Sequence, residues 1–578
     1  MTLRRWSGVL AGLSVLAAAG VAQAAEPNSA PRLVVVISVD QFSTNLFNEW
    51  RPRFQGGLKT LSREGLVYAN GWQSHSATET CPGHSTLLTG KHPYKTGIAA
   101  NDWVDPVTGK TVYCVADPGV TLADPIKGGN GPVSPKQLQA STLGDWLKAT
   151  SPQSRVYGIA GKDRGAITMA GHKADGVFWW QDDFGFTTWV EPGQTPEARL
   201  ADVAGLNARL KAHYAANPAA WTYTDDRCRA LEADYTSGGA AWRSRLPPAG
   251  KFRFDYSPFL DEVTTEGALQ LIADKKLGAG PATDVLAVSY SATDRIGHMW
   301  GTQGPEMCDQ LYRLDASIGR LLDALKTVPG GAVVVLTADH GGADFTERLN
   351  AQGYPEVRGL DFTILKRLNA GLKAQFKLDA DPVSFDSSGL YIVGKDRIRL
   401  PQPLRGKVAK AAVALLAKEP DVEAAWTLEE VLAGPPPPRG KPPEAFTLLE
   451  RATLSAAPGR SPDVVVALKP GVFPLAGRPG GPISTHGSPW DYDRRVPILV
   501  WWPGAPSQER FLSIETTDIA PTLAHLIGVA APADIDGRCL DLGGFAVSAC
   551  PMPAVAPPPP AEPAKPGFRW PWEKKPSP

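Results

Sequence analysis

Three runs of mostly β-branched and aliphatic residues constrain the fold of this chain more than any other feature. They span 32–39, 285–290 and 332–337, and they lack the polar–apolar alternation of a half-exposed strand. Each run is followed shortly by an aspartate, namely Asp40, Asp294 or Asp339. Strands of this kind are buried on both faces, as in a parallel sheet covered by helices. Because ligands bind at the carboxyl edge of such sheets, we expect three carboxylates at one binding edge.

In the segments between these runs, apolar residues recur with the spacing of an amphipathic helix. The clearest apolar stripe lies within 311–325 and is closed by the Pro-Gly-Gly sequence at 329–331, and a closing helix is predicted at 517–527. Two more apolar runs, 463–468 and 496–500, are predicted to continue the central sheet. Alternating strand and helix patterns favour an α/β fold with a largely parallel central sheet and helices on both faces.

Two stretches interrupt this alternation and are predicted to be cap insertions over the sheet edge. The first, about 171–259, is rich in aromatic residues and contains a candidate β-hairpin at 178–186. The second, about 353–462, contains a predicted helix near 407–418 and a proline-rich loop. At 578 residues and 43% hydrophobic content, the chain can form one large domain with such insertions.

Both ends of the chain differ in composition from its centre. Residues 1–24 hold two arginines, a short apolar run and an Ala-Gln-Ala site, which is the layout of a secretory signal peptide. The run is too short for a usual membrane span, although an uncleaved anchor is the alternative. We therefore expect a periplasmic or secreted protein with no stable membrane anchor after cleavage. Its mature domain would cover 25–550, followed by a proline-rich, disordered tail over 551–578.

The net charge and the cysteines narrow the classes of function. The formal net charge is +0, which argues against nucleic acid as a binding partner. Six cysteines in an exported chain favour disulfide bonds. Cys539 and Cys550 form the nearest pair along the sequence. The disulfide pairing and the oligomeric state do not follow from the sequence.

One hydroxyl, on Thr80, stands out as a candidate nucleophile. It opens the sequence Thr-Cys-Pro-Gly-His, a tight turn before an apolar run that can begin a helix. A threonine hydroxyl needs a base or a metal ion to become a nucleophile. Metal ligands are available, because Asp294 and His298 lie one helical turn apart and Asp339 is followed directly by His340.

Two further residues complete the candidate ligands. His486 stands in a predicted loop, in the sequence Thr-His-Gly, and Asp40 ends the first buried strand. Two sets of Asp and His ligands with open positions suit Zn²⁺ in a catalytic role. Such sites also accept Mn²⁺ or Co²⁺, so the sequence leaves the metal open.

In their order along the chain, these residues resemble the alkaline phosphatase superfamily over about 32–528. The residues that carry the resemblance are Asp40, Thr80, Asn101, Asp294, His298, Asp339, His340 and His486. The Thr-Cys-Pro-Gly-His sequence looks like the threonine-nucleophile branch, which is shared with nucleotide pyrophosphatase/phosphodiesterases. The resemblance implies two Zn²⁺ per chain. One would be held by Asp294, His298 and His486, and the other by Asp40, Asp339 and His340, with Thr80 as its additional ligand.

A Lys-Asp-Arg motif indicates to which branch of this superfamily the chain belongs. Lys162 and Arg164 resemble a pair that contacts the non-bridging phosphoryl oxygens in the Lys/Arg-containing threonine alkaline phosphatases of the PafA/PhoK type. A phosphate monoester carries one more negative charge than a diester. Positively charged donors such as Lys and Arg therefore form stronger hydrogen bonds with a monoester. The resemblance also implies that Asn101 donates to a phosphoryl oxygen. His84 is a candidate brace for the turn that carries the nucleophile.

The resemblance implies an exported, zinc-dependent alkaline phosphatase that hydrolyses small-molecule phosphate monoesters with broad specificity. The expected route is a phosphothreonine intermediate on a two-metal site, with activity that rises toward alkaline pH. One alternative is a phosphodiesterase or nucleotide pyrophosphatase that uses the same site. A third is a zinc-binding protein without catalytic activity. The natural substrate does not follow from the sequence.

Overall fold

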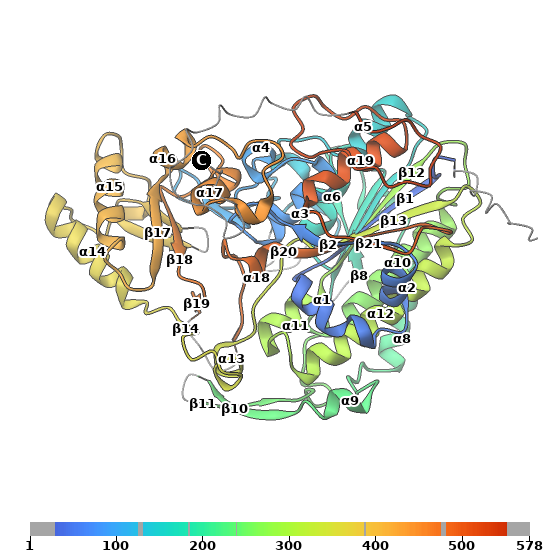
Figure 1. The fold of residues 1–578 in the computed structure, drawn as a ribbon, viewed down its shortest axis with the longest axis horizontal. Helices are drawn as coiled ribbons and strands as arrows, with labels where there is room; N and C mark the ends of the chain where they lie inside the picture. The colour runs from blue at the N-terminus through green and yellow to red at the C-terminus, as the bar shows by residue number, and fades with distance from the viewer. Residues whose placement is uncertain are drawn as a thin grey trace, which may run out of the picture.

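The computed structural model describes residues 29–124, 131–182, 185–237, 240–386, 389–475 and 481–551. The predicted signal peptide and nearly all of the proline-rich tail lie outside these residues. Within the described part, a ten-stranded sheet forms the centre of the molecule (Figure 1). Its main path runs β21 (Gln508–Arg510), β2 (Leu66–Trp72), β20 (Arg495–Trp501), β13 (Ala332–Thr337), β1 (Leu33–Val39), β12 (Asp284–Tyr290), β6 (Val156–Ala160), β7 (Gly176–Gln181) and β8 (Gly185–Thr187), and β22 (Ile514–Glu515) pairs with β2.

The middle of this sheet is parallel, as the unbroken apolar runs predict. Strand β1 pairs in parallel with both β12 and β13, and β12, β6 and β7 continue the parallel arrangement. Strands β20 and β8 are antiparallel to their neighbours β13 and β7. All seven residues of β1 are buried. The three strands that precede the predicted aspartates are therefore adjacent, in the order β13, β1, β12.

Helices cover both faces of the sheet, which confirms the predicted fold class. On one face, Leu33, Val35 and Ile37 of β1 belong to an apolar cluster that includes residues of several helices. Among these helices are α1 (Thr44–Trp50), α2 (Gly57–Arg63), α10 (Phe259–Asp274) and α12 (Pro305–Leu325). On the other face, Val34 and Val36 pack in a second cluster with α3 (Thr80–Thr89), α5 (Leu143–Thr150) and α19 (Ile519–Leu526). Alternate side chains of one strand thus support two separate cores.

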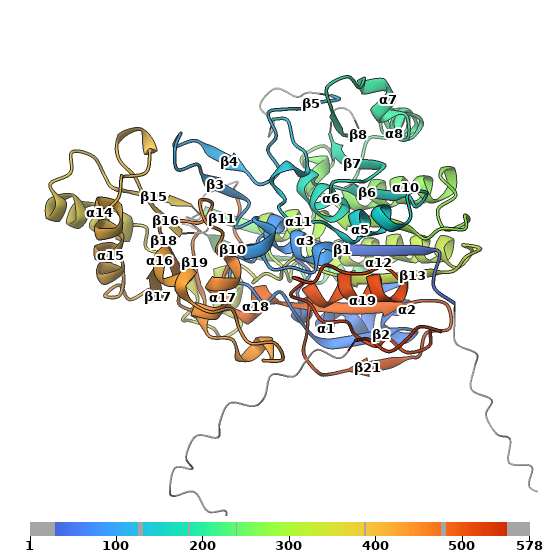
Figure 2. The same cartoon turned by 90° about the horizontal axis from the view of Figure 1, so that it is seen from above.

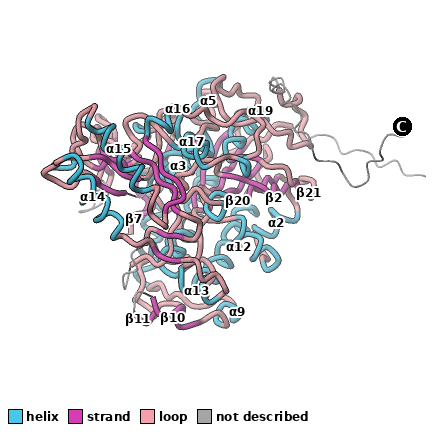
Figure 3. Tube along the Cα trace, turned by 60° about the vertical axis from the view of Figure 1, so that its left-hand side comes forward, coloured by secondary structure: helices cyan, strands magenta, loops and turns pink. Residues whose placement is uncertain are grey.

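A smaller α/β unit, here called the cap, lies to the left of the central sheet in Figures 1 and 2. It contains a four-stranded sheet in the order β15 (Val383–Asp386), β16 (Gly389–Ile392), β18 (Val464–Leu468) and β17 (Val422–Thr427). Helices α14 (Thr363–Phe376) and α15 (Leu404–Leu416) share its apolar cluster and form the outer edge of the molecule in Figure 3. Helix α15 confirms the helix predicted near 407–418.

Two predictions from the sequence about which sheet a strand joins are wrong. The run at 463–468 forms β18 of the cap rather than a strand of the central sheet, because its partners are β16 and β17. In the stretch 171–259, strand β7 pairs with β6 and so belongs to the central sheet. An apolar run shows that a strand is buried, but it carries no information about which sheet the strand joins.

The remainder of 171–259 differs from the core. Strands β7 and β8 form the predicted antiparallel hairpin. After it come α8 (Ala204–Ala216) and a two-stranded sheet of β10 (Ala233–Ser237) and β11 (Ala240–Ser244), which lies at the bottom of Figure 1. Among the described helices, none combines the length and the apolar character required to cross a membrane.

Candidate active site

The carboxyl ends of β1, β12 and β13 bring the predicted acidic residues together. Asp40 follows β1 directly, and Asp339 comes two residues after the end of β13. Asp294 lies in the first turn of α11 (Ala292–Trp300), the helix that follows β12. Because the three strands are parallel neighbours, these carboxylates meet at one edge of the sheet. The remaining predicted ligands join them in two groups of three.

The first group, the buried trio, contains Asp40, Asp339 and His340. Their candidate ligand atoms lie within 4.8 Å of one another, and all three side chains are buried. His340 Nε2 lies 3.4 Å from Asp40 Oδ1 and 3.3 Å from Asp339 Oδ2. The other oxygen of Asp339 accepts hydrogen bonds from the backbone N–H groups of Gln41 and His340, at 3.1 and 3.0 Å. These bonds fix the carboxylate so that Oδ2 points toward the trio.

The second group, the rim trio, contains Asp294, His298 and His486. Asp294 Oδ1 lies 3.3 Å from Nε2 of each histidine. The side chains are 5, 25 and 7% exposed, in that order, so this trio is more open to solvent than the buried trio. Asp294 and His298 come from one turn of α11, whereas His486 comes from a loop that follows the cap.

Backbone carbonyls orient the three histidines of the two trios. Nδ1 of His298, His340 and His486 donates to the carbonyl of Ser484, Gly341 and Thr78 respectively, each at 2.8 Å. A carbonyl only accepts, so each Nδ1 carries the proton and each Nε2 presents a lone pair. This arrangement is typical of metal-binding histidines, whose second ring nitrogen is held by a hydrogen bond.

The spacing and the polar environment of both trios fit a metal ion. Tetrahedral zinc with bonds of about 2.0–2.1 Å separates neighbouring ligand atoms by about 3.3 Å, which is close to the distances found here. Among the described residues, Asp40 Oδ1, Asp294 Oδ1 and His340 Nε2 are buried without a hydrogen-bond partner. Buried polar atoms seldom remain unpaired. A cation at each trio would satisfy them.

The pKa values of the residues in the two trios are shifted by burial and by the positive and negative groups close to them. Burial lowers the pKa of His340, but in the absence of a cation the carboxylates of Asp339 and Asp40 outweigh burial and raise it to about 9, so a metal ion would take the place of a proton on Nε2. Burial lowers the pKa of His486 to about 3, and the charge of His340 adds to this effect. Burial raises the pKa of Asp294, but Lys162 and His298 reverse the shift and hold it well below its usual range. The buried carboxylates therefore retain their negative charge only beside cations.

Lys162 lies between the two trios. Its Nζ is 2.6 Å from Asp40 Oδ2 and 2.5 Å from Asp294 Oδ2, and the side chain is only 4% exposed. Lys162 is the N-cap of α6 (Asp163–Ala170), which follows β6. The parallel pairing of β6 with β12 thus carries this cation to the same edge of the sheet as Asp294.

The candidate nucleophile is the first residue of α3. Thr80 is buried, and Arg164 Nη2 donates to its Oγ1 at 3.3 Å. The first turn of α3 packs against the end of β13, since a Cβ on Gly83 would lie 2.0 Å from the carbonyl oxygen of Asp339. Only glycine permits this close approach. It sets the helix that carries Thr80 directly against the strand end that carries the buried trio.

Asn101 lies beside the same helix start. Its Oδ1 accepts from the backbone N–H of Cys81 at 2.8 Å, and its own backbone N–H donates to Glu79 at 2.7 Å. The side-chain amide is therefore anchored at the residue next to Thr80.

Two residues that support this region were not fully recognised in the sequence. Tyr113 accepts from Arg164 Nη1 at 3.2 Å and donates to Asp163 at 2.6 Å, so it positions the guanidinium. His84 contacts the carbonyl of Thr80 through Nδ1 at 2.9 Å and Ser289 Oγ through Nε2 at 2.8 Å, as a brace would. A disulfide joins Cys81 to Cys114, beside both Thr80 and Tyr113. The sequence around Tyr113 contains no motif that predicts its role. Only the neighbouring Cys114 could have drawn attention to this position.

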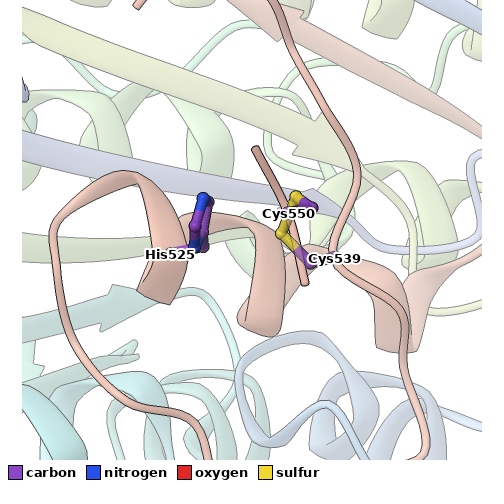
Figure 4. Close-up of side chains that lie close together, drawn as sticks. All are labelled: His525, Cys539 and Cys550. Atoms are coloured by element: carbon purple, nitrogen blue, oxygen red, sulfur yellow. A yellow bond between two sulfur atoms is a disulfide. The ribbon is translucent and has the colours of Figure 1, made fainter. Parts of the chain in front are cut away.

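A third group of potential ligands lies elsewhere. His525, Cys539 and Cys550 are close together, as Figure 4 shows. The two sulfur atoms form a disulfide, so the two cysteines nearest along the sequence are joined. Their sulfur atoms are therefore not available as thiolate ligands. The other described disulfide joins Cys228 to Cys308.

Comparison with known proteins identifies the class of this chain. The sequence model of the type I phosphodiesterase / nucleotide pyrophosphatase family matches residues 34–489. The chain therefore belongs to this family, within the alkaline phosphatase superfamily. A match of this extent covers both trios, helix α3 with the candidate nucleophile, and the cap.

More similar relatives define the branch. Alkaline phosphatase PhoD of Zymomonas mobilis is 41% identical over 547 residues, which cover 93% of this chain and 92% of that protein. Alkaline phosphatase PhoK of a Sphingomonas species is 39% identical over 522 residues, with 89 and 91% covered. The crystal structure of alkaline phosphatase PafA matches with a TM-score of 0.76 at 26% identity and covers 88% of this chain and 98% of that one. The chain is thus of the PafA/PhoK type, and it is an enzyme, a phosphatase.

Proposed function

We propose that the enzyme is an exported, zinc-dependent phosphomonoesterase of broad specificity that forms a phosphothreonine on Thr80. One observation carries this proposal. The two trios, the cation Lys162 between them, and Thr80 with its hydrogen-bonded Arg164 all gather at one edge of the sheet.

The buried trio of Asp40, Asp339 and His340, and the rim trio of Asp294, His298 and His486, would each hold one Zn²⁺. Bound zinc supplies Lewis acidity at the attacking and leaving oxygens and lowers the pKa of hydroxyls and water bound to it. The protonated Nδ1 atoms and the fixed Asp339 carboxylate keep the ligand atoms in place. Loss of a metal would therefore affect chemistry more than the position of these side chains.

Thr80 provides the nucleophile. Its Oγ loses the hydroxyl proton to solvent and attacks phosphorus, a new P–O bond forms, and the bond to the alcohol breaks; the alcohol leaves with a proton taken up from solvent. Water then cleaves the phosphothreonine, which restores the hydroxyl and releases phosphate. The position of Thr80 at the start of α3 places the phosphoryl group near a helix N-terminus, which favours negative charge.

Three side chains would stabilise the phosphoryl oxygens. Arg164 already contacts Thr80 Oγ1, and Tyr113 holds its guanidinium in that position. Lys162 carries its charge to the space between the trios. Asn101 is anchored beside Thr80 and can donate from its amide. Two cations and an amide suit the doubly charged phosphoryl group of a monoester.

The covalent step is tested with two variants of one residue. Thr80→Ala removes the nucleophile and should lower kcat for p-nitrophenyl phosphate by about 10³-fold or more, whereas Thr80→Ser keeps a hydroxyl and should retain much of the activity. Rapid quenching with a ³²P-labelled monoester should trap label at position 80 in the wild type and in Thr80→Ser, and not in Thr80→Ala. Wild-type turnover by Thr80→Ala, or label on another residue, would contradict the proposal.

One observation favours a phosphodiesterase as the second candidate. A cavity of about 330 Å³ borders His486 and is lined mainly by apolar side chains, among them Leu365, Phe473 and Trp490. An apolar wall can accept the second substituent of a diester. The ratio of kcat/KM for p-nitrophenyl phosphate to that for its bis ester separates the candidates. We expect a ratio well above one, and its collapse when both Lys162 and Arg164 are replaced by alanine.

The proposal of export rests on two features. The N-terminal sequence has the layout of a signal peptide. All six cysteines lie in three disulfides, which persist in oxidising compartments such as the periplasm. Fractionation of cells that express the full chain would test export. Enzyme that stays in the cytoplasm with residues 1–24 uncleaved would contradict it.

A further inference from the structure

A polar cavity of about 260 Å³ opens beside Lys162 and Arg164. The same cavity is also lined by Trp180, Asp182, Arg253, Asp255 and Arg295, here called the outer wall. None of these five residues belongs to either trio or to the proposed phosphoryl contacts. A phosphoryl group held by Lys162 and Arg164 has this cavity as its neighbour, so the rest of the substrate can extend into it.

Asp255 organises the outer wall. It accepts from Arg253 Nε and Nη2 at 2.9 and 2.7 Å, and Arg295 Nη1 lies 3.0 Å away. Its side chain is only 9% exposed. Each guanidinium carries five N–H donors, and Asp255 uses one or two of them. Both arginines therefore keep donors for a ligand while one carboxylate holds them in place.

Aromatic contacts make the wall rigid. The guanidinium groups of Arg253 and Arg295 lie 4.7 and 5.1 Å from the ring centroid of Tyr256. Trp180 stacks on Phe254 with centroids 5.2 Å apart, and its Nε1 donates to Asp182 at 2.7 Å. Side chains that are already ordered lose little entropy when a ligand binds.

The charges of the outer wall indicate what kind of group it accepts. Its two arginines are balanced by the carboxylates of Asp182 and Asp255. Burial and the neighbouring carboxylate of Asp255 raise the pKa of Asp182 to about 6, which shows that negative charge is already crowded here. A second anion would add to this repulsion. A purely apolar group would leave the donors and acceptors of the wall without partners.

Hydroxyl groups both donate and accept, and they carry no charge. We propose that the outer wall binds the hydroxyl-bearing alcohol moiety of a polyol phosphate, such as a sugar phosphate, with Trp180 against one face of the moiety. This inference rests on the proposed phosphomonoesterase activity and deepens it, since it names a substrate class for the same site.

The test compares three monoesters: glucose 6-phosphate, phenyl phosphate and phosphoglycolate, which respectively offer hydroxyls, an apolar ring and a second anion. The measured quantity is kcat/KM for each, in the wild type, Arg253→Ala and Trp180→Leu. Arg253 is 67% exposed, so its replacement should not prevent folding. The matched control is Arg243→Ala, an arginine of β11 that is 70% exposed and lies outside the cavity.

We expect Arg253→Ala to lower the ratio of kcat/KM for glucose 6-phosphate to that for phenyl phosphate by roughly tenfold, because a charge-assisted hydrogen bond is lost. Trp180→Leu should lower the same ratio, and Arg243→Ala should leave it unchanged. An unchanged ratio in both cavity variants overturns the inference. A selective loss on phosphoglycolate also overturns it and makes the cavity an anion subsite. No turnover of any monoester by the wild type would instead refute the proposed function, and the inference would fall with it.

Discussion

The two trios of candidate ligands offer the same chemistry but are built in different ways. The buried trio comes from the ends of two adjacent parallel strands, β1 and β13, and its three side chains are fully buried. The rim trio takes Asp294 and His298 from a single helix and His486 from a loop almost two hundred residues further along. His298 is 25% exposed. One trio is thus part of the core, and the other is assembled at its margin.

This difference predicts that the two trios differ in how tightly they bind a metal ion and in how well they tolerate substitution. The ligands of the buried trio are held by the sheet and by backbone hydrogen bonds to Asp339, so they are ordered by the fold itself. The rim trio depends on three separate supports. Asp261 of α10 accepts from the backbone N–H groups of Ser291 and Ala292 at the start of α11, and the carbonyls of Ser484 and Thr78 hold the two histidines. We therefore expect the rim trio to bind its metal less tightly and to tolerate change better.

The largest expected effect comes from removing one ligand of the buried trio. Asp339→Asn replaces a carboxylate that organises Gln41 and His340, so it should lower kcat/KM by about 10³-fold or more and reduce the thermal unfolding midpoint. The matched change in the rim trio, His298→Asn, should lower kcat/KM by only about 10²-fold, with partial recovery in excess zinc, because two ligands remain on ordered supports. Steady-state kinetics and thermal unfolding of both variants measure this. Equal losses without recovery would remove the distinction between the trios.

A smaller difference between the trios is expected in the order in which the wild type loses its metal ions. Titration with a chelator, followed by metal analysis, should release one equivalent before the other, and activity should fall with the first. The rim trio should lose its metal first, because it is more open to solvent and to the chelator. The His298→Asn variant is the control, since it should hold only one equivalent from the start. Release of both equivalents in a single step would contradict this order.

The same comparison explains what could be predicted from the sequence. The buried trio follows from local patterns, because each of its residues comes within three positions of the end of an unbroken apolar strand. Within the rim trio, Asp294 and His298 have helical spacing, but nothing local connects them with His486. Only the order of motifs along the chain indicated this partner.

The errors have a related physical cause. The apolar runs at 463–468 and 496–500 look alike, yet one forms β18 of the cap and the other lies in β20 of the central sheet. The pairing of a strand is set by contacts with residues far away in the chain, and single-strand patterns contain no such information. The same limit applies to Tyr113, whose role depends on its distance from Arg164. Residues proposed to act directly were easier to recognise than residues that position them.

The smallest expected effect concerns the support behind the rim trio. Burial raises the pKa of Asp261 to about 7, although hydrogen bonds from Ala292 and Gln310 oppose the shift. The folded protein therefore binds a proton that the unfolded chain releases near its usual pKa of about 3.9. Between about pH 4 and 7 the folded state binds more protons, so the free energy of unfolding falls as pH rises.

Asp261→Asn removes this titration but keeps an oxygen for the N–H groups of Ser291 and Ala292. The stability of the wild type relative to this variant should fall between pH 5 and 8, by roughly 1–3 kcal/mol. Thermal unfolding of the metal-free proteins at both pH values measures the change. Asp274→Asn, an exposed position on the same helix α10, is the control and should leave the pH dependence of the wild type intact. Parallel pH dependence of the wild type and Asp261→Asn would show that Asp261 keeps its charge in the fold, and that α11 is supported by an ionised carboxylate.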